Sequence, residues 1–310
     1  MEPTNTALCV DIGGTSTKAG LVDGAGRISF IDSIPTEPDG DQFAAALSRL
    51  IERSARAAAD TGGKPRGIGI AVAGFLDSGR RKLIYNPNLA WLQEFPLKDR
   101  IAQQFDLPIE LEIDSNAACM AEYRFGFNQE PARFLCLTAG TGLGVGMALD
   151  GKPLRFAYGC MGDAGHLIVD RYGPKCSCGG RGCAEALISA PALAHRYRIA
   201  TGCEECVSLR DVIAAAENGS SSAIEILHDA GAALGVAIAS LANTFFPDHV
   251  AIAGGLSAAG ELVIEPAKRA FCEGASKLAR SRTKLTCASL GPNATLIGAA
   301  WPFWKELSDG

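Results

Sequence analysis

The sequence predicts an α/β fold built from two similar halves. Short apolar strands alternate with amphipathic helical segments along the 310 residues, which is typical of sheets covered by helices. A second observation is an internal repeat. The pattern of strand, Gly/Thr turn, strand and Asp-Gly at 7–24 recurs at 137–151, so that Gly13 corresponds to Gly140 and Gly14 to Thr141.

The first half of the chain opens with a predicted hairpin. Apolar residues at 7–12 form one strand and residues 18–22 the other, with Asp23-Gly24 as the turn signal at the far end. Helical spacing of apolar residues, with arginines on the opposite face, predicts an amphipathic helix at 41–60. The remaining elements expected in this half are buried strands at 67–72 and 107–113 and a helix at 116–123.

The second half repeats the alternation of strands and helices. After the strand–turn–strand pattern at 137–151, the sequence predicts one long helix or two abutting helices at 221–246. The elements expected after it are a strand at 250–253 that runs into Gly254-Gly255, a helix at 256–270, and a C-terminal helix at 296–306 bent at Pro302.

Composition limits the classes of function. The chain has 47% hydrophobic and 20% charged residues, which is ordinary for a globular enzyme, and its net charge of −5 disfavours binding to nucleic acid through a basic surface. Residues 1–10 have no apolar leader and the apolar run at 232–246 is short for a membrane span, so no membrane partner is expected. Eleven cysteines, mostly in apolar surroundings, favour free thiols in a reducing cytoplasm.

One stretch, 162–185, combines a histidine with three closely spaced cysteines. His166, Cys176, Cys178 and Cys183 supply one imidazole and three thiolates, which is a complete tetrahedral set for Zn²⁺. Four protein ligands leave no open position, so the predicted zinc is structural. The alternative is a glycine-rich surface loop with free thiols. A zinc at this place would fix Asp163 and Glu185 relative to His166.

The two repeated turns are candidates for phosphate binding. Glycine lets backbone N–H groups approach an anion, and threonine adds a hydroxyl donor. Asp11 precedes the first turn, where a carboxylate can hold hydrated Mg²⁺, and Lys18 is placed to reach a phosphate. The alternative for each turn is an ordinary tight hairpin. The candidate residues in the turns are Gly13, Gly14, Thr15, Gly140, Thr141 and Gly142.

Asp114 ends a predicted strand and opens a helix, and two roles for it remain open. It is either the N-cap of that helix, which is common for aspartate, or a general base that accepts the proton of an attacking hydroxyl. Ser115 and Asn116 are also able to cap the helix, which would leave Asp114 free for chemistry.

Over essentially its whole length the chain resembles the ROK group of sugar kinases, within the actin-like, ribonuclease-H-like ATPase fold. The resemblance rests on motifs spread from one end of the chain to the other. They are DIGGT at 11–15, PNLAW at 87–91, EIDSN at 112–116, TAGTGLGVG at 138–146, GDAGH at 162–166, CSCGGRGCAE at 176–185 and AGGLS at 253–257.

The resemblance implies a role for each matching residue. Asp114 would be the base that activates a sugar hydroxyl against the γ-phosphate of ATP. The two Gly/Thr turns would line the triphosphate, and Gly254 and Gly255 would contact the nucleotide. The side chains implied to hydrogen-bond the sugar are those of Asn88, Asp163, His166 and Glu185, with His166 using one ring nitrogen for zinc and the other for sugar.

Two departures from the family pattern bear on the choice of sugar. The usual glutamate of the Glu-x-Gly-His motif is Asp163, one methylene shorter, and the usual asparagine before the base is Ile113. An isoleucine facing a sugar hydroxyl would leave that hydroxyl unpaired, at a cost of roughly 1–3 kcal/mol. The expected acceptor is therefore a hexose, with an N-acetylhexosamine or fructose as the alternatives.

Other predictions concern domains, partners and rival functions. The family fold implies an N-terminal lobe at 1–115 plus about 295–310, a C-terminal lobe at 116–294 that carries the zinc loop, and a homodimer. Some family members are repressors with an N-terminal DNA-reading segment, whereas here the phosphate turn opens almost at once, at Asp11. A non-catalytic sugar sensor is the other rival, but both Asp11 and Asp114 are retained.

Overall fold

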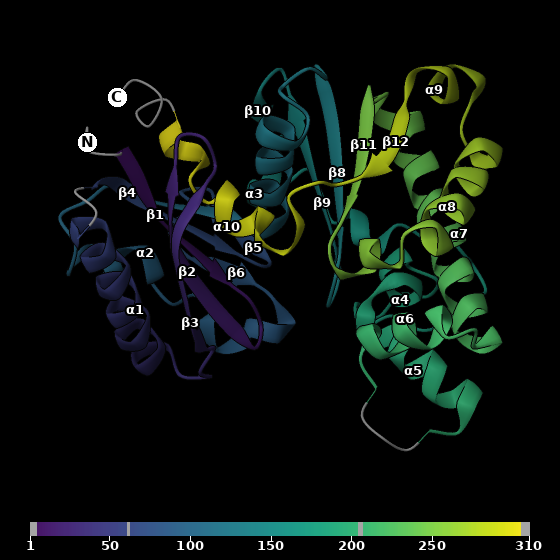
Figure 1. Cartoon of the computed structure of the whole chain (residues 1–310), viewed down its shortest axis with the longest axis horizontal. Coiled ribbons are helices and arrows are strands. Elements are labelled where there is room, and N and C mark those ends of the chain that lie inside the picture. Colours follow the sequence, from purple (N-terminus) through teal and green to yellow (C-terminus); the bar gives the residue numbers. More distant parts are fainter. Residues whose placement is uncertain (1–4, 61–62, 204–206, 305–310) are drawn as a thin grey trace. The chain divides into compact units, whose positions relative to one another are not determined.

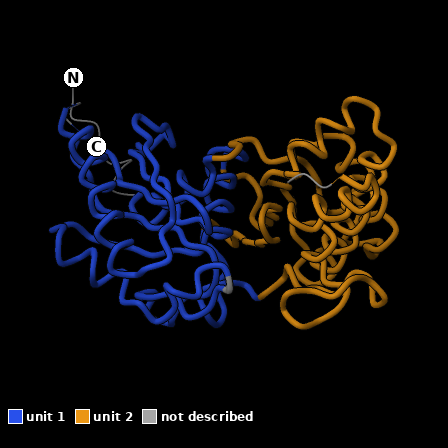
Figure 2. Tube along the Cα trace, turned by 90° about the horizontal axis from the view of Figure 1, so that it is seen from below, with its two compact units in different colours: residues 1–128, 152–162, 293–310 blue, residues 129–151, 163–292 orange. Residues whose placement is uncertain are grey.

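The computed structural model describes residues 5–60, 63–203 and 207–304, and these form two compact units (Figures 1 and 2). Unit 1 contains residues 1–128, 152–162 and 293–310, and unit 2 contains residues 129–151 and 163–292. Residues 116–128 and 152–162, assigned to the second lobe in the sequence analysis, therefore group with unit 1. Helix α3 (Asp114–Ala121) packs there against α10 (Ala294–Gly298), where a Cβ added to Gly298 would lie 1.7 Å from the Ala117 carbonyl oxygen.

Two five-stranded sheets share one topology, as the internal repeat predicted. The first has the order β3-β2-β1-β4-β7 and the second β10-β9-β8-β11-β12. In both sheets the first two strands along the chain, β1 with β2 and β8 with β9, form an antiparallel hairpin. The later strands, β4 and β7 in the first sheet and β11 and β12 in the second, run parallel to the first strand of that hairpin. The strands are β1 (Asn5–Ile12), β2 (Ser16–Asp23), β3 (Ile28–Pro35), β4 (Lys64–Val72), β7 (Ile109–Ile113), β8 (Arg133–Ala139), β9 (Leu143–Leu149), β10 (Lys152–Pro153), β11 (His249–Ala253) and β12 (Lys284–Cys287).

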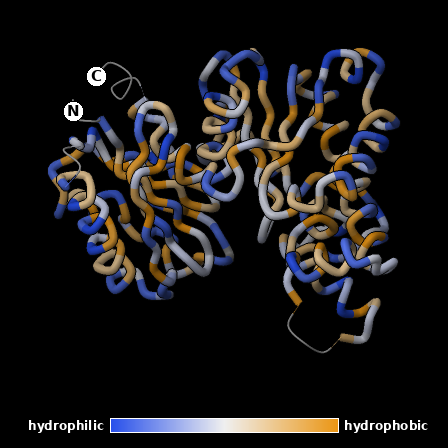
Figure 3. Tube along the Cα trace, viewed as in Figure 1, coloured by the Kyte–Doolittle hydropathy of each residue, from blue (hydrophilic) through white to orange (hydrophobic). Residues whose placement is uncertain are grey.

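Helices cover both faces of the first sheet. Alternate strand residues such as Val10 and Ile70 join the hydrophobic core formed with α1 (Gly40–Asp60), whose buried stripe includes Phe43 and Leu47. On the opposite face, a Cβ at Gly69 would lie 1.8 Å from the Ala299 carbonyl oxygen, so glycine lets the segment after α10 approach closely. Figure 3 shows hydrophobic residues along the strands of both sheets.

Unit 1 also holds short elements around the ends of its strands. Two-stranded β5 (Phe75–Leu76) and β6 (Leu83–Tyr85) follow β4 and lead into the 3₁₀ helix η1 (Pro87–Leu92). The others are α2 (Leu97–Ala102), the π-helical turn η2 (Glu122–Gly126), and the 3₁₀ turns η3 (Ala157–Gly159) and η7 (Trp301–Phe303).

Unit 2 is dominated by α7 (Ser221–Phe245) and α8 (Glu261–Gly274). Length and composition alone would allow α7 to span a membrane, but 56% of its most apolar window is buried in unit 2. A Cβ at Gly235 would lie 2.3 Å from the Ala267 carbonyl oxygen, so the two helices are in close contact. The other helices are η4 (Ala164–His166), α4 (Ala184–Ile188), α5 (Ala190–Thr201), α6 (Leu209–Glu217), η5 (Gly255–Ala259) and α9 (Lys277–Arg282).

Most predicted elements are present, and three differ. The long helix at 221–246 is a single helix. The helix expected at 256–270 is interrupted at Gly260, where φ is +55°, so a 3₁₀ turn precedes α8. The C-terminal helix expected at 296–306 ends at Gly298 and is followed by the 3₁₀ turn that contains Pro302, while residues 305–306 lie outside the described part of the chain. Helix α3 begins at Asp114 rather than at 116.

Candidate functional site

The first Gly/Thr turn connects β1 to β2 at the carboxyl end of β1. The Gly13 N–H donates to the Ser16 carbonyl at 3.1 Å, which closes the turn. Thr36, the residue after β3, donates its hydroxyl to the Gly13 carbonyl at 2.8 Å. Gly14 and Thr15 are exposed. Gly14 and Thr15 are thus accessible to a ligand, and phosphate binding at this turn stays a prediction.

Asp11 lies beneath this turn, paired across the hairpin with Lys18. Burial raises the pKa of Asp11 to about 6; the neighbouring Asp114 carboxylate adds to the rise, and Lys18 opposes it. The structure therefore brings Asp11 and Asp114 together, one from the end of β1 and the other from the end of β7. Strand β4 lies between these strands and is parallel to both.

Asp114 is the first residue of α3 and does not cap it. Ile113 occupies the N-cap position without a side-chain hydrogen bond. The Asp114 carboxylate accepts the Ser115 N–H at 2.7 Å, and burial raises its pKa while backbone N–H groups lower it. Of the two roles considered from the sequence, the N-cap is excluded, which leaves the carboxylate available for chemistry.

Two further predicted positions lie in unit 1. Asn88 is exposed in η1, and its Cβ is 3.7 Å from the position of a Cβ built on Gly14, so it lies beside the first turn. Its N–H donates to the Asn86 side chain at 2.7 Å, which fixes the start of η1. Ile113 is 3% exposed and belongs to the hydrophobic core, so its side chain serves packing rather than facing an open site.

The second Gly/Thr turn connects β8 to β9 in unit 2. The Gly140 N–H donates to the Gly142 carbonyl at 2.9 Å, and the Gly140 carbonyl accepts the Ala190 N–H at 2.8 Å. Gly254 lies against this turn, because a Cβ there would be 2.3 Å from the Ala139 carbonyl oxygen. The structure thus brings Gly254 against this turn, and the contact of both with a nucleotide stays a prediction.

Glu185 has a partner that the sequence did not suggest. Its carboxylate oxygen Oε2 accepts the Leu143 N–H at 3.0 Å and lies 2.5 Å from the position of a Cβ built on Gly142. The acid implied to bind sugar is therefore also bonded to the end of the second Gly/Thr turn.

The predicted metal ligands converge in unit 2. One ligand atom from each of His166, Cys176, Cys178 and Cys183 lies within 4.8 Å of the others. The Cys178 and Cys183 sulfurs are 3.6 Å apart, and Cys176 Sγ is 3.5 Å from His166 Nδ1. Ligands of a tetrahedral zinc at about 2.3 Å are about 3.8 Å apart, so this donor set fits the ion.

Electrostatics at the cluster also suit a cation. The Gly180 N–H donates to Cys178 Sγ at 3.4 Å and is the main cause of a lowered Cys178 pKa. Burial raises the pKa of Cys183 to about 12, a cost that a bound cation would remove. The second ring nitrogen of His166, Nε2, lies 3.7 Å from the Asp163 carboxylate. The imidazole therefore has one nitrogen toward the thiols and the other toward an acid that is predicted to bind the sugar.

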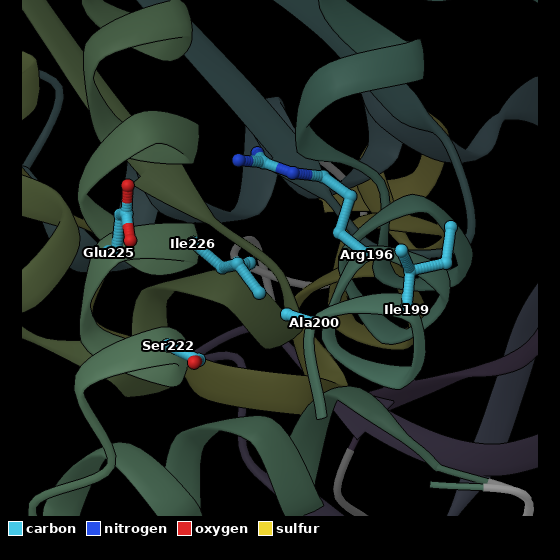
Figure 4. Close-up of a pocket in the computed structure, with 6 residues that line it drawn as sticks. All are labelled: Arg196, Ile199, Ala200, Ser222, Glu225 and Ile226. Carbon is cyan, nitrogen blue, oxygen red and sulfur yellow. The ribbon is translucent and has the colours of Figure 1, made fainter. Parts of the chain in front are cut away.

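A separate pocket of about 310 Å³ lies between α5 and α7 in unit 2 (Figure 4). It is lined by three apolar residues, Ile199, Ala200 and Ile226, and by Arg196, Ser222 and Glu225. Arg196 also pairs with Asp229 at 2.5 Å. None of the predicted site residues lines this pocket.

The sequence analysis missed a buried ionic cluster beside Asp114. Glu112 is 1% exposed on β7 and pairs with Arg155 and Arg80. The available signal was an acid at an inward position of an apolar strand, but its partners lie more than thirty residues away along the chain, and no local pattern identifies them.

Two α/β units with one sheet order, each with a Gly/Thr turn after its first strand, are consistent with the two-domain fold of actin-like ATPases. Comparison with known proteins narrows the class. The ROK family model matches residues 7–306, and the chain belongs to the ROK family.

Similar proteins include kinases and a regulator. The glucokinase of Streptomyces coelicolor is 30% identical over 309 residues, covering 94% of this chain and 95% of the relative. The crystal structure of a ROK family glucokinase from Streptomyces griseus, in complex with glucose and AMPPNP, has a TM-score of 0.84 at 32% identity and covers 96% and 98% of the two chains. A ROK family transcriptional regulator, homologous to the MLC protein of E. coli, has a TM-score of 0.88 at 27% identity and covers 99% of this chain and 79% of its own.

Proposed function

We propose that this chain is a sugar kinase that transfers the γ-phosphoryl group of ATP to a hydroxyl of a hexose. The observation that carries the proposal is the Asp114 carboxylate, which does not serve as the N-cap of α3 and has a raised pKa. It lies beside Asp11, near the first Gly/Thr turn. A base of raised pKa accepts the hydroxyl proton as the oxygen attacks phosphorus. The likeness to glucokinases over almost the whole chain supports the same activity.

Each remaining site residue has a proposed part. Asp11 would hold hydrated Mg²⁺ on the triphosphate, and Lys18 would neutralise phosphate charge. The two Gly/Thr turns would donate N–H and hydroxyl groups to the phosphates, with Gly254 and Gly255 against the nucleotide. The side chains proposed to hydrogen-bond sugar hydroxyls are those of Asn88, Asp163, His166 and Glu185.

We also propose that His166, Cys176, Cys178 and Cys183 hold a structural Zn²⁺. The ion would fix the imidazole through Nδ1 and leave Nε2 for the substrate, and it would hold the loop that carries Glu185. Metal analysis of the purified protein should find one zinc per chain. Protein that is fully active and fully folded without zinc would contradict this assignment.

The central test is Asp114→Asn. The amide keeps the size of the side chain but cannot accept the proton, so kcat should fall by a factor of about 10²–10⁴ while sugar affinity stays within a few-fold. ADP release measured with a panel of aldoses, ketoses and N-acetylhexosamines would give kcat, and calorimetry would give sugar affinity. A variant with near-normal kcat would refute the assignment of the base.

The same panel separates the alternatives. Preference for an N-acetylhexosamine or fructose over glucose would show that the acceptor is one of these sugars. Asp163, which is one methylene shorter than the usual glutamate, is a reason to test them. Sugar binding without ADP release would instead support a sugar-sensing role, which the likeness to a ROK regulator makes worth testing. We further propose a homodimer, which light scattering of the purified chain would test.

A further inference from the structure

Glu112, two positions before the proposed base Asp114, lies in a buried ionic cluster. Glu112 on β7 is 1% exposed, and its Oε2 atom pairs with Arg155 Nη2 and lies 3.7 Å from Arg80 Nη1. Arg155 belongs to the segment 152–162 of unit 1, which precedes the loop carrying Asp163 and His166. A carboxylate at this depth needs such partners, because an unpaired buried charge is very costly.

The second carboxylate oxygen of Glu112 bonds one residue on each side of Asp114, the backbone of Ile113 and the side chain of Asn116. Glu112 Oε1 accepts the Ile113 N–H at 2.9 Å and Asn116 Nδ2 at 3.0 Å. Asn116 is fully buried, and its Nδ2 also donates to the Gly159 carbonyl at 2.8 Å. Strand β7, the first turn of α3 and the segment 155–159 are therefore connected through one side chain.

This arrangement is poorly explained by stability alone. Buried ion pairs are often no more stable than apolar side chains of similar size, because desolvation offsets the attraction. Among the described residues, the buried atoms Asn116 Oδ1 and Arg155 Nε have no hydrogen-bond partner, which adds a further cost. A costly, incompletely satisfied cluster beside a reactive group suggests a role in holding geometry.

We propose that Glu112 is a positioning residue for Asp114. Together with Arg155 and Asn116, it fixes the junction between β7 and α3, and this holds the Asp114 carboxylate where the attacking hydroxyl arrives. The inference rests on the proposed function, since it assigns Asp114 the role of base. Misplacing a catalytic group by about 1 Å can lower turnover about a hundredfold.

The test uses Glu112→Gln in the full-length chain. Glutamine keeps the volume and one acceptor oxygen but loses the charge that holds Arg155. We expect kcat to fall by a factor of about ten to a hundred, with KM for sugar and for ATP within about threefold of wild type. Arg155→Met, at a residue with 26% side-chain exposure, tests the same link without removing the buried acid and should lower kcat in the same direction.

Glu110→Gln is the matched control. Glu110 lies on the same strand and pairs with Arg80 at 3.3 Å and Lys98 at 3.5 Å, but no hydrogen bond connects it to Ile113 or Asn116. Its removal should leave kcat unchanged. Thermal melting of every variant identifies any that fails to fold, and Arg155→Met then carries the test.

A double variant separates positioning from general support of the fold. If Glu112 acts through Asp114, adding Glu112→Gln to Asp114→Asn should not lower the residual turnover further. A further loss of similar size in that background would overturn the proposal, as would an active Glu112→Gln variant with normal kcat. A wild-type chain that releases no ADP with any sugar would contradict the proposed function itself.

Discussion

At the scale of a single residue, the proposed role of Asp11 and its surroundings favour opposite charge states of its carboxyl group. Its carboxylate lies under the first Gly/Thr turn, where the proposed Mg²⁺ would require a charged group, yet burial and Asp114 raise its pKa to about 6. The native chain therefore binds this proton more tightly than the unfolded chain, whose ordinary pKa is 3.8. As pH rises from about 4 to 6 this group lowers the stability of the ligand-free protein, and the loss remains at neutral pH.

Asp11→Asn should separate the proposed role of Asp11 from the effect of its surroundings. Removing the buried charge should raise the melting temperature of the ligand-free protein by a few degrees at neutral pH, since a shift of about two pKa units corresponds to at most about 3 kcal/mol. At pH near 4 the gain should disappear, because the native aspartate is then protonated. Turnover in Mg²⁺ should fall at least about tenfold. Equal melting temperatures of the variant and the wild type at neutral pH would show that the Asp11 charge does not lower the stability of the ligand-free protein.

At the scale of elements, the second phosphate turn and α4 are joined through Glu185. The Leu143 N–H donates to one carboxylate oxygen at 3.0 Å, and the other oxygen is the one that would accept the proposed sugar hydroxyl. A Cβ at Gly142 would displace this carboxylate, because Glu185 Oε2 lies 2.5 Å from the Cβ position.

Gly142→Ala should therefore weaken sugar binding without unfolding the chain. The new Cβ would lie 2.5 Å from Glu185 Oε2, so the flexible acid moves away and loses its bond to Leu143. We expect sugar affinity in the absence of ATP, measured by calorimetry, to fall about tenfold, which is the loss of about one hydrogen bond to a charged group. Gly140→Ala is the control, because a Cβ at Gly140 meets no atom within 4 Å. If both variants bind sugar equally, Glu185 has no such role.

The sequence predicted what depends on local pattern and missed what depends on distant partners. The turns, the strand that precedes Asp114 and the spacing of Cys176, Cys178 and Cys183 are local signals; the structure contains both turns and the strand, and it brings the three cysteines together. The break at Gly260 and the packing role of Ile113 depend on tertiary neighbours. The bonds from Glu112 to Arg155 and from Glu185 to Leu143 join residues about forty positions apart, so no local pattern contains them.

At the scale of the whole molecule, the two units have the same sheet order but different optical probes. The three tryptophans, Trp91, Trp301 and Trp304, all belong to unit 1, whereas α7 and α8, the main paired helices of unit 2, contain none. Tryptophan fluorescence therefore reports the unfolding of unit 1, and far-ultraviolet circular dichroism reports both units.

Gly235→Ala should destabilise unit 2 selectively. The added Cβ would lie 2.3 Å from a backbone oxygen of α8, which cannot move as a side chain does, and such overpacking costs about 1–3 kcal/mol. In a urea titration the circular dichroism midpoint should fall while the fluorescence midpoint stays unchanged. Val236→Ala, at a neighbouring exposed residue, should move neither. Equal shifts of both midpoints would show that the units unfold as one.

The close packing of Gly69 against Ala299 has a consequence for synthesis on the ribosome. Strand β4, which carries Gly69, emerges early, but the segment that covers this face of the sheet is translated only after unit 2. Unit 2 is complete once residue 292 has emerged, and a nascent chain at that length still exposes an apolar sheet surface in unit 1. The unit that begins to fold first is thus the last to be finished.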